Sequence, residues 1–169
     1  TIFVANLNER QTRAQVGSTR RPPPIPSAFR DVRWDNGYEF ARQGGCVILG
    51  RGGQILFADV PGVFRVRVIA PLQDRVARVR EASGGDERHA RQAVQQSDNE
   101  RAAFHRFLFH ARWDSADLYD LVINTHGISP KTAAAIVVKT LAAKEIAGKK
   151  REASRRLENL YLARKAIVA

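Results

Sequence analysis

The segment Cys46–Gly53, with the sequence CVILGRGG, joins an apolar run of strand length to glycines that flank one arginine. Glycine lets the backbone come close to a ligand, and the guanidinium of Arg51 offers planar N–H donors that suit a phosphate. A strand that ends in such a turn is typical of a phosphate or nucleotide site. Gly50, Arg51 and Gly52 are therefore candidate ligand-binding residues.

The chain has no lysine before Lys131. Loops that hold a nucleoside triphosphate usually end in Gly-Lys-Ser/Thr, because the lysine contacts the β and γ phosphates. The segment Val16–Thr19 lacks a lysine and precedes a run of prolines, so we do not expect it to be such a loop. The sequence starts at Thr1 and contains no methionine. We therefore expect it to be a fragment of a longer protein, with the phosphate loop upstream of Thr1 and with methionine residues left out of the sequence. The alternative is a relative that has lost the phosphate loop.

Asp98 and Arg101 are three residues apart in a polar stretch of helical pattern, so they share one face of a helix. There the carboxylate can accept a sugar hydroxyl while the arginine binds a phosphate. Phosphoryl transfer needs converging cations rather than a nucleophile, since its catalysis is mainly positioning and charge stabilisation. The alternative is a surface ion pair worth about 0–1 kcal/mol.

Further arginines are spaced along the same half of the chain. Arg75, Arg78 and Arg80 fall in a helical pattern, and Arg65 and Arg67 lie on one face of an expected strand. Each group can also be a solvated face without a ligand. An Ala- and Arg-rich composition alone accounts for many such residues, so only their position in the fold can show which of these arginines could bind a ligand.

Other reactive side chains favour structural roles. The lone Cys46 lies in an apolar strand pattern and is expected to be a buried structural thiol. The four histidines lack close spacing to acidic or cysteine side chains, so we predict no metal site. Asp114, Asp117 and Asp120 cluster in a predicted loop, where aspartate favours turns, and magnesium binding is the lesser alternative.

Composition narrows the class of protein. The chain has 169 residues, is 44% hydrophobic and 27% charged, and carries a formal net charge of +11. No apolar run reaches the roughly 18–20 residues of a membrane span, and no signal peptide is evident, so we expect a cytoplasmic protein. The positive charge suits phosphate-bearing partners. Aromatic residues, however, do not interleave with the arginines as in a stacking platform for nucleic acid.

The pattern of apolar residues, prolines and glycines predicts alternating strands and helices. We expect an extended arm over 1–34 because of its proline run, a folded domain over 35–147 and a C-terminal helix over 148–169. Strands are predicted at Cys46–Leu49, Val63–Ala70 and Leu121–Asn124, and helices at Leu72–Glu81, Glu87–Phe109, Pro130–Ala147 and Lys149–Ala169. The order favours an α/β fold with a mainly parallel sheet and ligands at the carboxyl ends of its strands.

Four segments, in this order, resemble the cytidylate kinase-like branch of the P-loop kinases: Cys46–Gly53, Val63–Arg80, Ser97–Phe104 and Tyr119–Thr125. The resemblance extends from Glu39 to Leu141, so it implies that 35–147 is a cytidylate kinase-like domain with a three-layer α/β sandwich. In this chain we expect that sandwich to be partial, without its first strand and phosphate loop.

The resemblance also implies roles for single residues. Arg51 matches the arginine that holds the acceptor nucleotide, although Gly52 replaces the aspartate usual in cytidylate kinases. Arg75 and Arg78 match arginines of the lid, which neutralise the transferring phosphoryl group. Asp98 and Arg101 match the pair that binds the acceptor's ribose and phosphate.

The implied function of the full-length protein is transfer of the γ-phosphate of ATP to a pyrimidine nucleoside monophosphate, with CMP as the expected acceptor and Mg²⁺ as cofactor. The expected partners are thus a nucleoside monophosphate and ATP, with no membrane; self-association stays open. Two alternatives remain: a nucleotide-binding regulatory module without catalysis, and a basic nucleic-acid-binding domain.

Overall fold

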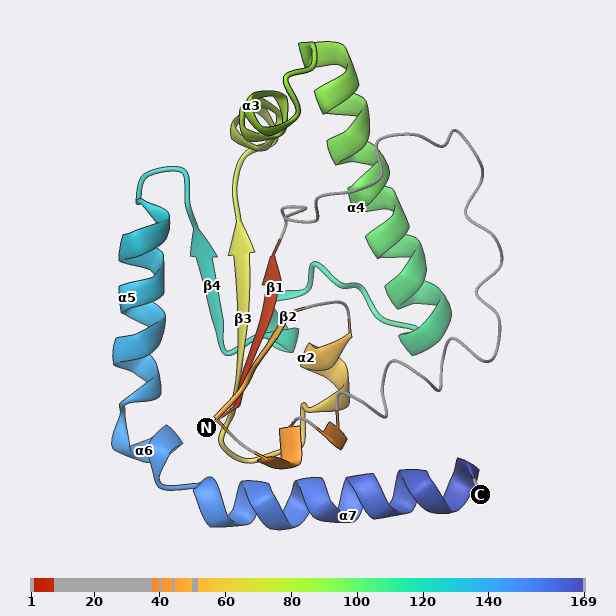
Figure 1. Cartoon of the computed structure of the whole chain (residues 1–169), viewed down its shortest axis with the longest axis vertical. Coiled ribbons are helices and arrows are strands. Elements are labelled where there is room, and N and C mark those ends of the chain that lie inside the picture. Colours follow the sequence, from red (N-terminus) through yellow and green to blue (C-terminus); the bar gives the residue numbers. More distant parts are fainter. Residues whose placement is uncertain (1, 8–37, 40, 44, 50–51, 169) are drawn as a thin grey trace.

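The computed structural model describes residues 2–7, 38–39, 41–43, 45–49 and 52–168. Its centre is a four-stranded parallel sheet in the order β2-β1-β3-β4 (Figure 1). The strands are β1 (Ile2–Leu7), β2 (Val47–Leu49), β3 (Val63–Ile69) and β4 (Leu121–Asn124). Parallel neighbours need crossover connections. Helices α3 and α4 provide one of them, between β3 and β4. The α/β fold with a parallel sheet is confirmed.

Strand β1 corrects the prediction for the N-terminal segment. We expected 1–34 to be an extended arm and the first strand of the fold to be missing. Instead, Ile2–Leu7 pairs with β2 on one side and with β3 on the other, in a register from Ile2↔Val63 to Leu7↔Val68. Its six residues, IFVANL, are too short a signal to identify without their neighbours. The rest of the predicted arm, with Val16–Thr19, lies outside the described residues.

One face of the sheet is covered by α5 (Pro130–Leu141) and the short α6 (Lys144–Ala147). Side chains alternate across a strand, so Phe64 and Val66 of β3 face α5, where they form a core cluster with Ile123, Ala133 and Val137. Ser129 caps α5 by accepting a hydrogen bond from the Thr132 backbone N–H, as the Ser-Pro start predicts.

The helix predicted over Pro130–Ala147 is interrupted after Leu141, which corrects that range. Leu141 and Ile146 both pack against the α5 cluster. On one straight helix, residues five apart point about 140° away from each other. The turn between α5 and α6 therefore lets both apolar side chains face the same core.

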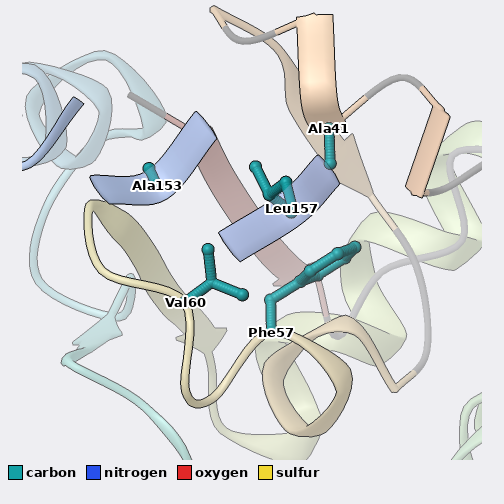
Figure 2. Packing of buried hydrophobic residues seen from close by; sticks show 5 residues of the cluster. All are labelled: Ala41, Phe57, Val60, Ala153 and Leu157. Carbon is teal, nitrogen blue, oxygen red and sulfur yellow. The ribbon is translucent and has the colours of Figure 1, made fainter. Parts of the chain in front are cut away.

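The opposite side of the sheet carries α2 (Gly53–Leu56) and α4 (Glu87–Phe109), while α7 (Lys150–Val168) passes across the end of the sheet where the strands begin (Figure 1). Helices α4 and α5 thus lie on opposite sides of the sheet (Figure 1). The cluster in Figure 2 joins Phe57 and Val60 to Ala153 and Leu157 of α7, with Leu157 only 1% exposed. Cys46 packs at its edge, where burial raises the pKa of the thiol.

Helix α3 (Leu72–Ser83) begins directly after β3 and packs against α4. Their contact is a small cluster of Val76, Ala90 and Val94. Asp86 caps α4 by accepting a hydrogen bond from the His89 backbone N–H. The strand predicted at Leu121–Asn124 and the helix predicted at Glu87–Phe109 have the predicted bounds. In the part of the chain that the structure describes, no helix combines the length and apolar character that crossing a bilayer requires.

Candidate functional site

Four arginines gather around the end of the sheet where β3 and β4 finish. We name them the arginine cluster: Arg67, Arg75, Arg78 and Arg101. They come from β3, α3 and α4, which adjoin this end of the sheet because β3 runs straight into α3 (Figure 1). The carboxyl ends of parallel strands are the usual place for ligands in α/β folds.

Two arginines of the cluster converge on Asp98. Arg75 donates from Nη1 to both Asp98 carboxylate oxygens, at 3.0 and 2.8 Å, and from Nε to the Ala70 carbonyl at 3.2 Å. Arg101 Nη1 lies 3.5 Å from Asp98 Oδ1. The side chains of Arg75 and Arg101 are only 10% and 5% exposed. Asp98 and Arg101 do share a helix face as predicted, but the alternative of a surface ion pair is wrong.

The sequence named Arg75 as a site residue but did not predict that it is the main partner of Asp98. Arg75 lies on a different helix, 23 residues away. Helical spacing identifies the neighbour at three residues but says nothing of a second helix. The contact exists because α3 and α4 pack together through Val76 and Val94.

Arg67 lies against an aromatic ring instead of in solvent. Its guanidinium carbon is 4.5 Å from the centre of the Trp113 ring, and its Nη1 donates to the Asp114 carbonyl at 2.6 Å. The guanidinium of Arg101 is 4.9 Å from the same ring. Such cation–π contacts favour a fixed guanidinium orientation. Trp113 therefore ties β3 and α4 together through two arginines.

Arg65 forms a structural ion pair at the other end of the same strand face. Its guanidinium donates to Asp120 at 2.6 and 3.0 Å, and its backbone N–H donates to the same carboxylate at 2.7 Å. Burial raises the pKa of Asp120, but the hydrogen bonds from Arg65 outweigh it, so the pKa lies below its usual value. The alternative of a solvated strand face is thus wrong for Arg65 and Arg67.

Arg78 connects α3 with the end of β4. Its guanidinium lies 3.4 Å from both the hydroxyl and the carbonyl oxygen of Thr125. Thr125 is buried, and its backbone N–H donates to the Ile69 carbonyl at 2.8 Å. Next to it, His126 Nδ1 lies 2.7 Å from Asp74 Oδ2. The first turns of α3 are therefore fastened to the carboxyl end of the sheet.

The glycine–arginine segment is described only in part. Gly50 and Arg51 lie outside the described residues, whereas Gly52 has φ 94° and precedes α2. That left-handed conformation suits glycine, which has no Cβ. The Gly52 N–H donates to the side-chain oxygen of Gln54 at 3.2 Å. Gln54 in turn contacts His105 of α4, with 2.7 Å between their Nε2 atoms.

Neither Gln54 nor His105 was a predicted site residue. Both are 0% exposed. The histidines were weighed only as metal ligands, and their spacing predicts no metal site. Within the described residues, no group of three or more His, Cys, Asp and Glu side chains is placed to hold a metal ion. A glutamine after the glycines and a histidine four residues after Arg101 give no recognisable signal on their own.

The arrangement can bind an anion. Several arginines from separate elements converge on one edge of the sheet, and two of them are almost fully buried. Guanidinium groups in partly desolvated positions bind phosphate more strongly than exposed lysines do, because the planar fork loses little freedom on binding.

Comparisons with known proteins agree with this fold. A sequence model of the cytidylate kinase-like family matches residues 6–127, which starts within β1. The chain is 34% identical over 100 residues to a protein named uronate isomerase from Corynebacterium glutamicum. That match covers 59% of this chain but only 19% of the relative, so the chain spans about a fifth of its length.

A solved structure is similar in fold. It is described as an uncharacterized protein from Eubacterium ventriosum and has a TM-score of 0.59 with 18% sequence identity. The similarity covers 83% of this chain and 96% of the other. The family model matches well over half of the sequence, so it shows the family to which this chain belongs. The chain belongs to the cytidylate kinase-like family and is a nucleotide kinase-like domain.

Proposed function

We propose that this domain binds a nucleoside monophosphate, with CMP as the preferred acceptor, at the edge of the sheet that carries the arginine cluster. The observation that supports it most directly is the buried Arg75–Asp98–Arg101 group, in which a carboxylate and two guanidiniums are held at the end of a parallel sheet. Asp98 is 28% exposed and can still accept a ribose hydroxyl. Arg101 binds the acceptor phosphate beside it.

In the full-length protein, the proposed reaction is phosphoryl transfer from ATP. An oxygen of the acceptor phosphate attacks the γ-phosphorus, the bond from that phosphorus to the β–γ bridging oxygen breaks, and CMP and ATP become CDP and ADP. Charge builds up on the transferring group and its neighbours, and arginines stabilise it. We assign this role to Arg78 and Arg75, with Arg51 on the acceptor side.

The two lid arginines differ in how they are held. Arg75 donates three hydrogen bonds, to Asp98 and to the Ala70 carbonyl. The contacts of Arg78 with Thr125 are longer, at 3.4–3.5 Å. We therefore expect Arg78 to move onto the phosphates, while Arg75 stabilises charge from its fixed position beside Asp98.

Among the described residues, no protein site for magnesium is evident. Since the described residues contain no cluster of three potential ligands, we assign no residue of this chain to Mg²⁺. The ion prefers phosphate oxygens and water, and would enter bound to ATP.

The first experiment is calorimetric binding of CMP, UMP, AMP and GMP to the whole chain. Arg101→Lys keeps the charge but loses the fork, so we expect CMP affinity to fall by about tenfold or more, as for loss of one charge-assisted contact. Arg106→Lys, on the same helix but exposed, is the matched control and should leave affinity within about twofold. Equal affinities in both variants would contradict the assignment of Arg101.

Turnover separates the alternatives. In a full-length protein with a phosphate loop, Arg51→Ala or Arg101→Ala should reduce CDP formation by several hundredfold, on the scale of other charge-stabilising groups. Tight mononucleotide binding without turnover would favour a regulatory module. Steeply salt-dependent binding of RNA or DNA without mononucleotide binding would favour a nucleic-acid-binding domain.

A further inference from the structure

Gln54 and His105 form a buried polar link between the glycine–arginine segment and α4. Their two Nε2 atoms are 2.7 Å apart, and both residues are 0% exposed. His105 Nδ1 lies 2.8 Å from the Arg101 carbonyl oxygen. At the other end, the Gln54 side-chain oxygen accepts from the Gly52 N–H. The link thus runs from the backbone of residue 52 to the backbone of residue 101.

Each hydrogen bond in this link has one allowed direction. A carbonyl oxygen can only accept, so His105 must carry its proton on Nδ1. The Nε2 atom of the neutral ring is then an acceptor and receives the N–H of the Gln54 amide. The Gln54 oxygen is left to accept from Gly52, as observed. A proton on His105 Nε2 would face the donor groups of Gln54 and break the series.

The surroundings show that packing alone does not require these polar groups. The ring of His105 lies among aromatic rings, with centroid distances of 5.4 Å to Phe104, 5.9 Å to Phe109 and 6.4 Å to Trp113. Apolar side chains of similar size would fill such a space without needing hydrogen-bond partners. The polar pair adds specific hydrogen bonds, which fix the position of the Gly52 backbone relative to the Arg101 backbone.

We infer that Gln54 and His105 are positioning residues of the acceptor site, a role that rests on the proposed function. The Gly52 N–H belongs to the peptide that follows Arg51, and the Arg101 carbonyl belongs to the residue assigned to the acceptor phosphate. The link therefore sets the spacing between the start of α2 at Gly52 and the turn of α4 that carries Arg101, about fifty positions apart in the sequence. A monophosphate that contacts both sides binds tightly only when that spacing is held.

The central test compares Gln54→Leu with Val137→Ala. Gln54→Leu removes both hydrogen bonds of Gln54 at similar volume, whereas Val137→Ala opens a space in the α5 cluster on the other face of the sheet. Thermal unfolding monitors the stability of both variants. We expect Gln54→Leu to weaken CMP binding by about tenfold or more and to speed amide exchange at Gly52. Val137→Ala should leave CMP affinity within about twofold, even at an equal loss of melting temperature.

A second variant keeps one hydrogen bond of the link and removes the other. Gln54→Glu can still accept from the Gly52 N–H, but its carboxylate has no N–H to donate to His105 Nε2. We therefore expect Gln54→Glu to weaken CMP binding by about tenfold or more. A purely structural role would lower the melting temperature of Gln54→Glu and leave the CMP affinity, measured well below that temperature, within about twofold of wild type.

The outcomes distinguish the inference from the proposed function. CMP binding by Gln54→Leu that equals wild type would overturn the positioning role alone. Nitrogen-15 spectra of the histidine ring should show a neutral His105 with its proton on Nδ1, and a proton on Nε2 would also overturn it. If wild type shows that ring state but binds no mononucleotide, the proposed function is the part that fails, and the acceptor role of the link fails with it.

Discussion

The ion pair between Arg75 and Asp98 should contribute measurably to stability, and its size can be worked out from the structure. Exposed ion pairs are worth about 0–1 kcal/mol, whereas breaking a buried pair costs about 3–5 kcal/mol. Arg75 is 10% exposed and Asp98 28%, with donor–acceptor distances of 2.8 and 3.0 Å. The pair lies between these limits. We expect Asp98→Asn to lower the free energy of unfolding by about 2–3 kcal/mol.

A double-mutant cycle isolates the interaction itself. Urea unfolding, followed by far-UV circular dichroism, is measured for wild type, Asp98→Asn, Arg75→Met and the double variant. We expect a coupling free energy of about 1–2 kcal/mol. The matched control is the Glu87–Arg91 pair on α4, where the distance is 3.3 Å and the side chains are 62% and 39% exposed. Its coupling should stay below about 0.5 kcal/mol.

The comparison has a clear refuting result. If the coupling free energy of Arg75 and Asp98 is no larger than that of Glu87 and Arg91, the ion pair between Arg75 and Asp98 is no stronger than an exposed pair. The site would then lack the preorganised carboxylate on which the proposed ribose contact depends. Arg101 is present in all four proteins of the cycle, so its own contact with Asp98 does not enter the coupling directly.

Two further predictions concern the core and the strand face. Leu157→Ala should lower the free energy of unfolding, measured in urea, by about 2–5 kcal/mol because Leu157 is 1% exposed. Leu162 lies on the same helix but is 54% exposed, so Leu162→Ala should change that free energy by about 0.5 kcal/mol or less. Equal losses in the two variants would contradict the packing in Figure 2. Because the folded-state pKa of Asp120 is below 3.8, its pair with Arg65 stabilises the fold above that pH and loses this contribution as the pH falls further. The stability gap between wild type and Asp120→Asn should therefore shrink below about pH 4, and a gap that stays constant would count against it.

Local elements could be predicted well because their signals are local. The Ser129–Pro130 start of α5 depends on capping and on a fixed proline φ, both properties of neighbouring residues. The faces of β3 follow from strand alternation. The shared helix face of Asp98 and Arg101 follows from helical periodicity.

Strand β1 and the Gln54–His105 link could not be predicted in the same way. A six-residue strand is recognisable only through the two strands that flank it, which begin more than forty positions later. Gln54 and His105 are 51 residues apart, and neither residue type points to the other. Only the packing of α4 beside α2 makes them partners.

The amino-acid sequence by itself determined the residue chemistry of this protein, most of its helices and strands, and the order of segments that marks its family. The tertiary structure decided which side chains meet. It made Arg75 the main partner of Asp98, placed Arg67 on Trp113 and joined the Gly52 backbone to α4. The physical reason is that local preferences act over a few residues, whereas burial and hydrogen bonding act between surfaces that only the folded chain brings together.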